Sequence, residues 1–191
     1  IAKEFEKAHE EAEIDTYDKL ISEIFNRFED EIDIDFEISD KLASVLEKFK
    51  TEDWSNLDIK EQLPAIQELV KTLGRELGLD KIPEILISDD ANDAYGFFDA
   101  RENTISLNSN YFSNGIELVN TIAHELRHAY QHMRADVLDT WEDALYKVNF
   151  DNYISPVQLP EGGWLFFTDY LHQYVEVDAR AFANIFTEAM S

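Results

Sequence analysis

The chain has 191 residues, enough for one domain with a full hydrophobic core. It is strongly acidic, with 41 Asp and Glu residues against 16 Lys and Arg residues and a formal net charge of −25. A surface of this charge repels nucleic acid and anionic lipid, so we expect neither as a partner. The chain has no cysteine, which excludes disulfides, cysteine-based zinc sites and thiol nucleophiles. No apolar run approaches the roughly 20 residues that a membrane helix needs, so we predict no membrane insertion.

Residues 1–80 are predicted to form an acidic helical extension. Apolar residues recur at helical spacing in a first helix, and Asp30–Asp35 is interpreted as an acidic connector. Ser39 is expected to cap a short second helix. A third helix follows, with Pro64 in its first turn and Gly78 at its C-terminal end.

Residues 81–191 are predicted to form the second domain. Ile82–Ser88 is expected to be a strand, and Tyr95–Asp99 and Thr104–Asn108 are expected to form a β-hairpin. The fold class is therefore α+β and helix-dominated, with a small antiparallel or mixed sheet. An acidic cluster before the hairpin lacks the spacing of an EF-hand loop, so we interpret it as a turn and not as a calcium site. This cluster comprises Asp89, Asp90, Asn92 and Asp93.

Three further helices are predicted after the hairpin. Asn114 is expected to cap a central helix that runs to about Val137. A short helix over Trp141–Phe150 follows, and the next residues, 151–168, contain two prolines and two glycines and are interpreted as a loop. The last helix is expected to span Asp169–Met190.

The central helix carries the motif H-E-x-x-H as His124-Glu125-Leu126-Arg127-His128. Two imidazoles four residues apart lie one turn apart on the same face of a helix and can bind one zinc ion. The Glu125 carboxylate could reach a water molecule at that metal and take its proton. The apolar stripe of the helix is roughly opposite to the histidines, so we expect the motif to face a cleft. The alternative is a set of surface side chains, because the motif also occurs in proteins without a metal.

The last helix offers a third ligand. Glu176 lies off the apolar stripe of that helix, with His172 one turn before it and Arg180 one turn after it. A carboxylate from this second helix would complete a site of two histidines and one glutamate, with the fourth position left for water. Asp178 falls inside the apolar stripe and needs a partner. It is interpreted either as the acceptor for the N–H of a ligating histidine or as half of a buried ion pair, and it is the reserve third ligand.

Another histidine, His132, lies one turn beyond the motif and is expected to be exposed or to support a ligand from outside the first coordination sphere. A metzincin would need a glycine at position 131 and a histidine at position 134. The chain has Gln131 and Arg134 at these positions, which excludes that class.

The sequence H-E-L-R-H-A-Y-Q, followed by E-x-D-A-x-x-F-A, resembles the gluzincin-type zinc metallopeptidases. Closest in pattern are the small bacterial and phage-associated peptidases of the ImmA/IrrE kind and related peptidase domains of toxins or effectors. The resemblance covers about residues 82–190. The second motif matches at Glu176, Ala179, Phe182 and Ala183.

The resemblance implies a zincin-like fold in which His124, His128 and Glu176 bind zinc and Glu125 is the general base. In such families a hairpin strand before the catalytic helix lines the cleft. Thr104–Leu107 would be that edge strand, and an extended substrate could pair with it.

We therefore predict a zinc-dependent peptidase acting on a protein or peptide substrate. His172 is the favoured second donor to the oxyanion, ahead of Tyr170, Tyr174, Arg180 and Tyr153.

Two alternatives stay open for residues 1–80, which could be the binding surface of a non-catalytic zinc-stabilised module, or the propeptide or delivery region of a toxin or effector peptidase. A deformylase is disfavoured, since it takes its third ligand from a cysteine. We expect a soluble bacterial protein, cytoplasmic or secreted, of undefined oligomeric state.

Overall fold

The structure is a computed structural model that describes residues 32, 34–50, 53–89, 94–159 and 163–191. The chain divides into two units, and the second of them, Ile34–Ser191, is compact. The predicted first helix and half of the acidic connector lie outside the described residues, as do Asp90, Asn92 and Asp93 of the acidic cluster.

The second unit begins with short helices. Helix α2 (Asp40–Leu46) continues into a 3-10 turn, η1 (Glu47–Phe49), and a second 3-10 turn follows, η2 (Trp54–Asn56). The Ser39 hydroxyl accepts a hydrogen bond from the Leu42 amide at 3.1 Å, which confirms the predicted cap.

Helix α3 (Ile59–Glu76) begins earlier than predicted. Asp58 caps it in a reciprocal capping box with Glu61, and this strong start places Pro64 inside the helix and not in its first turn. Gly78 follows the helix with a φ of 72°, the left-handed conformation that favours glycine at a helix end.

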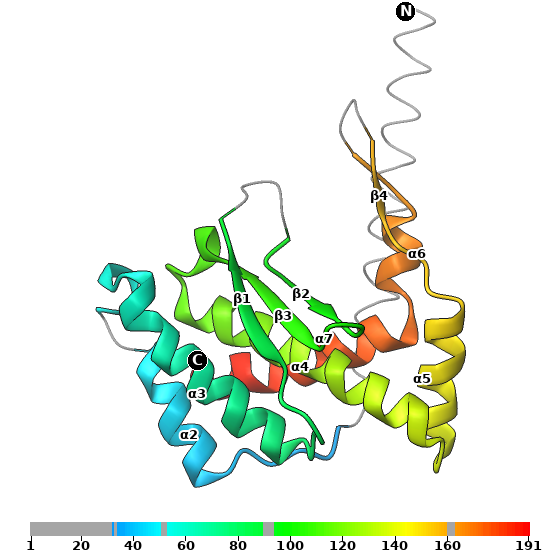
Figure 1. Cartoon of the computed structure of the whole chain (residues 1–191), viewed down its shortest axis with the longest axis horizontal. Helices are drawn as coiled ribbons and strands as arrows, with labels where there is room; N and C mark the ends of the chain where they lie inside the picture. Colours follow the sequence, from blue (N-terminus) through cyan, green and yellow to red (C-terminus); the bar gives the residue numbers. More distant parts are fainter. Residues whose placement is uncertain (1–31, 33, 51–52, 90–93, 160–162) are drawn as a thin grey trace, which may run out of the picture. The chain divides into compact units, whose positions relative to one another are not determined.

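The sheet is mixed, with three strands in the order β1-β3-β2 (Figure 1). β1 (Glu84–Ser88) is parallel to β3 (Thr104–Asn108), whereas β2 (Gly96–Asp99) is antiparallel to it. The predicted strand and hairpin are thus confirmed. The prediction that Thr104–Leu107 is an edge strand is wrong, because β3 pairs on both sides and β1 and β2 are the edges.

A 3-10 turn, η3 (Ser109–Tyr111), leads from the sheet to helix α4 (Gly115–Val137). The Asn114 side chain accepts hydrogen bonds from two amides of the first turn of α4, which confirms the predicted cap. Helix α5 (Trp141–Asp151) follows as predicted. The predicted loop after it contains two short antiparallel strands, β4 (Val157–Gln158) and β5 (Trp164–Leu165).

The prediction of one continuous last helix is wrong. The chain forms α6 (Phe167–Leu171) and α7 (Tyr174–Met190), separated by a break at Gln173. The Gln173 side chain accepts a hydrogen bond from the Ile154 amide at 2.7 Å and donates one to the Ile154 carbonyl at 2.8 Å. These two bonds hold Gln173 in an extended conformation, which ends α6 and starts α7.

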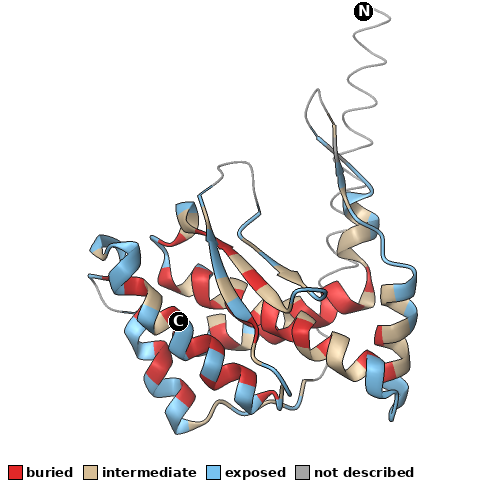
Figure 2. Ribbon diagram, in the orientation of Figure 1, coloured by how far each residue is buried: buried red, intermediate tan, exposed pale blue. Residues whose placement is uncertain are grey.

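One hydrophobic core contains residues of helices that precede the sheet in the sequence and of helices that follow it. Side chains of α2, α3, α4 and α7 are buried in the same cluster, among them Leu42, Leu69, Leu73, Leu118, Ile122 and Phe182. Figure 2 shows this buried material along α4 and α7. Helix α3 thus shares the core of α4, and the compact unit that contains both helices starts at Ile34.

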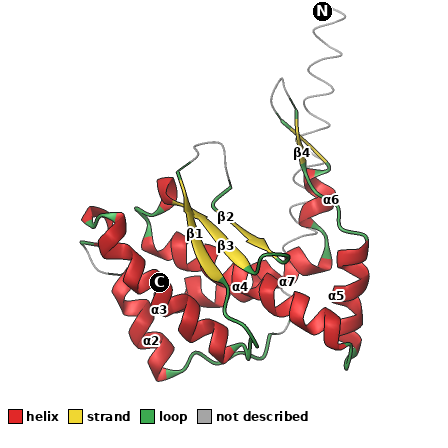
Figure 3. Ribbon diagram, in the orientation of Figure 1, coloured by secondary structure: helices red, strands yellow, loops and turns green. Residues whose placement is uncertain are grey.

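The fold class is α+β and helix-dominated, as predicted (Figure 3). Every helix of the described residues is too short or too polar to cross a lipid bilayer.

Candidate metal centre

Three side chains from two helices converge on one point. His124 and His128 of α4 and Glu176 of α7 each offer one ligand atom, and these atoms all lie within 4.8 Å of one another. The two Nε2 atoms are 3.1 Å apart. Each of them lies 3.5 Å from a different oxygen of the Glu176 carboxylate. The structure thus brings together the three residues that the sequence pointed to as metal ligands.

The spacing of these atoms fits a tetrahedral metal ion. Ligand bonds of about 2.0–2.1 Å place the ligand atoms of such a site about 3.3 Å apart. Glu176 is 1% exposed, and its Oε2 is buried with no hydrogen-bond partner among the described residues. A buried carboxylate oxygen without a partner is unfavourable unless a cation lies beside it. The donor set and this unpartnered oxygen therefore suit a divalent metal ion.

The electrostatics of the three side chains also favour a positive charge at this point. Burial alone would lower the pKa of His128, but the hydrogen bond and the charge of Glu176 outweigh it and raise that pKa to about 9. Burial alone would raise the pKa of Glu176, but His124 and His128 hold it well below its usual range. The carboxylate is therefore ionised and attracts either a proton on His128 or a metal ion.

The His128 ring is held in the tautomer that a metal requires. Its Nδ1 lies 2.8 Å from Oε1 of Gln131. An amide oxygen only accepts hydrogen bonds, so Nδ1 donates, and Nε2 of the neutral ring then carries the lone pair. Gln131 is itself fully buried, and its Nε2 donates to the Val175 carbonyl at 2.8 Å and to the Asp178 carboxylate at 2.6 Å.

Asp178 is the centre of this buried network. It is fully buried and accepts two hydrogen bonds from the Arg127 guanidinium at 2.7 and 2.8 Å. The Tyr146 hydroxyl donates to it at 3.3 Å. Of the two interpretations left open by the sequence, the structure shows the ion pair directly and a link to His128 only through Gln131. Asp178 lies outside the cluster of three ligand residues.

A cavity of about 540 Å³ opens onto the three ligand residues. Glu125 lies in its wall and is 7% exposed. Strand β2 forms another part of the wall and approaches α4 very closely at Gly96. A Cβ atom at this position would lie 2.6 Å from Cγ2 of Thr121 and 3.3 Å from Cγ of Glu125. Only glycine lets the strand pass this close to Glu125.

Two tyrosines complete the wall beside Glu176. The Tyr153 hydroxyl donates to Glu176 Oε1 at 2.6 Å, and Tyr170 lines the same cavity. Burial, reinforced by the charge of Glu176, raises the pKa of both phenols well above the usual value. Both therefore keep their protons and can donate hydrogen bonds.

His172 does not lie where the sequence placed it. We expected it one helical turn before Glu176 on a shared face, but it ends α6, before the break at Gln173, and it is not among the cavity-lining residues. Arg180 donates to the Leu171 carbonyl at 2.6 Å and so ties α7 to the end of α6.

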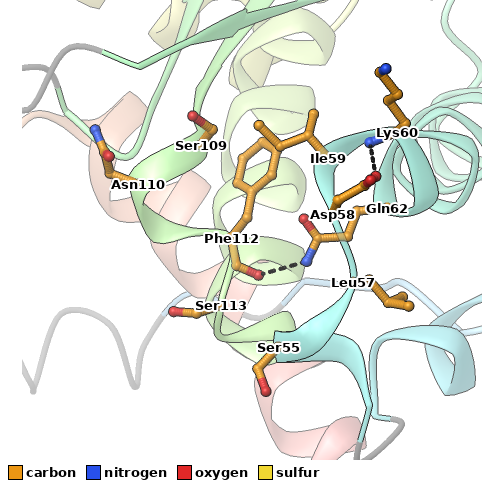
Figure 4. A pocket seen from close by; sticks show the side chains of 10 residues that line it. All are labelled: Ser55, Leu57, Asp58, Ile59, Lys60, Gln62, Ser109, Asn110, Phe112 and Ser113. Atoms are coloured by element: carbon orange, nitrogen blue, oxygen red, sulfur yellow. Dashed lines mark hydrogen bonds between the residues drawn. The ribbon is translucent and has the colours of Figure 1, made fainter.

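A second cavity, of about 520 Å³, lies at the start of α3 (Figure 4). Its polar groups serve the fold. Asp58 accepts hydrogen bonds from the amides of Lys60 and Glu61, and the Gln62 side chain donates to the carbonyls of Trp54 and Phe112. The chemistry of this cavity is that of a helix cap.

The sequence analysis did not identify Gly96, Arg127 and Gln131 as parts of the candidate metal centre or its support. A signal for Arg127 was present in the sequence. Asp178 lies inside an apolar stripe and needs a partner, and a cation on a facing helix, such as Arg127, is a natural candidate. In the sequence, Gln131 served only to exclude the metzincin class. The role of Gly96 depends on the packing of β2 against α4 and has no local signal.

The comparisons with known proteins support a metallopeptidase. Residues 50–144 match the model of a family described as "Putative metallopeptidase family (DUF6782)". This stretch contains α3, the sheet and α4 with His124, Glu125 and His128, but ends before Glu176. No curated protein and no solved structure matches the chain.

Proposed function

We propose that this protein is a zinc-dependent peptidase in which His124, His128 and Glu176 hold the metal and Glu125 is the general base. The observation that carries this proposal is the convergence of two imidazoles and a buried carboxylate at the wall of an open cavity that also contains Glu125. The similarity of residues 50–144 to a metallopeptidase family supports it. Two nitrogen ligands and one oxygen ligand are a donor set typical of catalytic zinc.

Zinc, when bound, would lower the pKa of a water molecule and polarise the carbonyl of the scissile bond. Glu125 would take a proton from the attacking water and later give it to the nitrogen of the leaving amine. Glu125 is nearly buried and lines the same cavity as the three ligand residues. Tyr170 would donate a hydrogen bond to the developing oxyanion, because its phenol keeps its proton and lines the cavity. Tyr153 would hold Glu176 in place through its hydrogen bond.

The substrate would lie along β2 and not along Thr104–Leu107. Within the part of the chain that the structure describes, β2 pairs with β3 on one side only, and Gly96–Arg101 line the cavity beside Glu125. An extended peptide could therefore add to the free edge of β2 by backbone hydrogen bonds. The acidic charge of the chain would favour basic substrates at long range.

The position of Glu125 disfavours a purely structural zinc site. Such a site needs no carboxylate in an open cavity next to its ligands, since structural zinc sites are closed. A propeptide that ends near residue 80 is also disfavoured. Its removal would take α2 and α3 out of the core that they share with α4.

Two measurements on the full chain would test the proposal. We expect about one zinc per wild-type chain by elemental analysis, and loss of this zinc in Glu176→Ala. Glu125→Gln should keep the zinc and the fold but reduce hydrolysis of an unfolded protein substrate by about a hundredfold to ten-thousandfold, as expected for removal of a general base. A Glu125→Gln protein that hydrolyses at the wild-type rate would contradict the assignment.

A further inference from the structure

An aromatic wall continues the cavity beyond the ligands. It consists of Phe98 of β2, His132 of α4 and Phe150 of α5, all of which line the cavity. The rings of His132 and Phe150 are stacked, with centroids 3.7 Å apart and planes 15° from parallel. The Phe98 ring lies 5.9 Å from His132. Three separate elements thus bring their aromatic rings together in the wall of the cavity.

The wall is apolar in spite of its histidine. Burial, with a further contribution from the charge of His128, lowers the pKa of His132 to about 4. A neutral imidazole stacked on a phenyl ring presents a largely apolar surface. An aromatic wall of this kind favours an apolar side chain over a carboxylate, whose desolvation would not be compensated.

The wall also lies at a suitable distance from the ligands. His132 is one helical turn beyond His128, a rise of about 6 Å along α4. An extended peptide advances about 3.3 Å per residue, so this rise corresponds to about two residues. Phe98 is two residues after Gly96 on β2, and alternate side chains of a strand share a face, so Phe98 points to the same face on which Gly96 meets Glu125. A peptide paired with β2 would present alternate side chains to this wall.

We infer that Phe98, His132 and Phe150 form a specificity subsite that takes a large apolar side chain, aromatic or aliphatic, about two residues from the scissile bond. This inference rests on the proposed peptidase function and adds the class of substrate. The occupant would bury its side chain against three rings. Substrates with an acidic residue or a glycine at this position would be poor ones.

The test uses the zinc-loaded full chain and a positional-scanning library of internally quenched peptides. Wild type should cleave peptides with Phe, Tyr, Leu or Met at one fixed position about ten to a hundred times better than the same peptides with Ala or Asp there. Phe150→Ala should abolish this preference. Val148→Ala, a variant of an exposed residue on the same helix, should retain the wild-type preference.

A second variant and a binding measurement separate the subsite from the reaction. His132→Arg places a cation in the wall and should shift the preference towards acidic residues. This variant tests the subsite independently if Phe150→Ala fails to fold. Binding of the same peptides to zinc-loaded Glu125→Gln needs no turnover. Binding with the apolar preference but no wild-type cleavage would refute the peptidase and retain the subsite. Cleavage without any preference at that position would refute the subsite and retain the peptidase, and neither binding nor cleavage would refute both.

Discussion

The Arg127 guanidinium donates two hydrogen bonds, at 2.7 and 2.8 Å, to the Asp178 carboxylate across the contact between α4 and α7. Each residue stands next to the candidate site, since Arg127 precedes His128 and Asp178 is two residues after Glu176. The pair therefore fixes the two helices in the position at which their ligand atoms meet. A bidentate geometry restricts rotation as well as distance, which a single hydrogen bond would not do.

Arg127→Met should destabilise the protein by about 3–5 kcal/mol, because it leaves the fully buried Asp178 carboxylate without its counter-charge. The double variant Arg127→Met/Asp178→Leu should recover most of this loss, since no buried charge remains. Urea denaturation of the metal-free proteins measures both effects. Equal destabilisation by the single and the double variant would show that the ion pair itself, and not the unpaired carboxylate, carries the effect.

Gln131→Leu should lower the affinity for zinc by about tenfold to a hundredfold, because it removes the acceptor that fixes the His128 tautomer and orientation. Competition with a chromogenic chelator measures this affinity independently of any hydrolysis. Gln67→Leu, at an exposed position of α3, is the matched control and should bind zinc as wild type does. Wild-type affinity in Gln131→Leu would mean that packing alone orients the ring.

The affinity for zinc should rise with pH, about tenfold per unit, until the pH reaches about 9. In the metal-free protein His128 carries a proton below this pKa, and zinc must displace that proton to reach Nε2. Calorimetric titrations at several pH values and in buffers of different ionisation enthalpy would count the released protons. An affinity that is constant between pH 7 and pH 9 would contradict the raised pKa.

The stability of the metal-free protein should follow the opposite trend. The pKa of His128 is raised from 6.5 in the unfolded chain to about 9 in the fold. The contribution of this group to stability is therefore complete below pH 6.5 and is lost as the pH rises towards 9. Denaturation midpoints measured in the presence of a chelator across this range would show the decline, and an increase would contradict it.

Gly96→Ala should reduce activity and stability together. The added Cβ would lie 2.6 Å from the Thr121 side chain, so β2 must move away from α4 and from Glu125. Displacements of this kind cost about 1–3 kcal/mol in well-packed regions. Thermal denaturation and kcat/KM measure the two effects. Thr121→Ser removes the closest methyl group and, combined with Gly96→Ala, should restore part of both.

Local features of the structure were predictable from the sequence. The Asn114 cap, the H-E-x-x-H face of α4 and the β2–β3 hairpin depend on residues within a few positions of one another. The assembly of Glu176 with the two histidines was also predictable. Glu176 lies off the apolar stripe of its helix, and a site with two histidines needs a third ligand.

Two other features, which depend on contacts between distant residues, left no signal in the sequence. The break that separates α6 from α7 follows from the two hydrogen bonds between Gln173 and Ile154, which are 19 residues apart in sequence. The position of β2 at the edge follows from the parallel pairing of β1 with β3, which no local pattern encodes. The predictions for His172 and for the edge strand were wrong because both depend on such non-local contacts.

The two helices that supply the ligands also determine when the site can exist during synthesis. A ribosome that has completed α4 has made both histidines, but Glu176 and the Asp178 partner of Arg127 follow about fifty residues later, since 51 positions separate Arg127 from Asp178. A growing chain therefore has no complete metal site until α7 has emerged and packed. A hydrolase assembled in this way stays inert while its own unfolded polypeptide is the nearest available substrate.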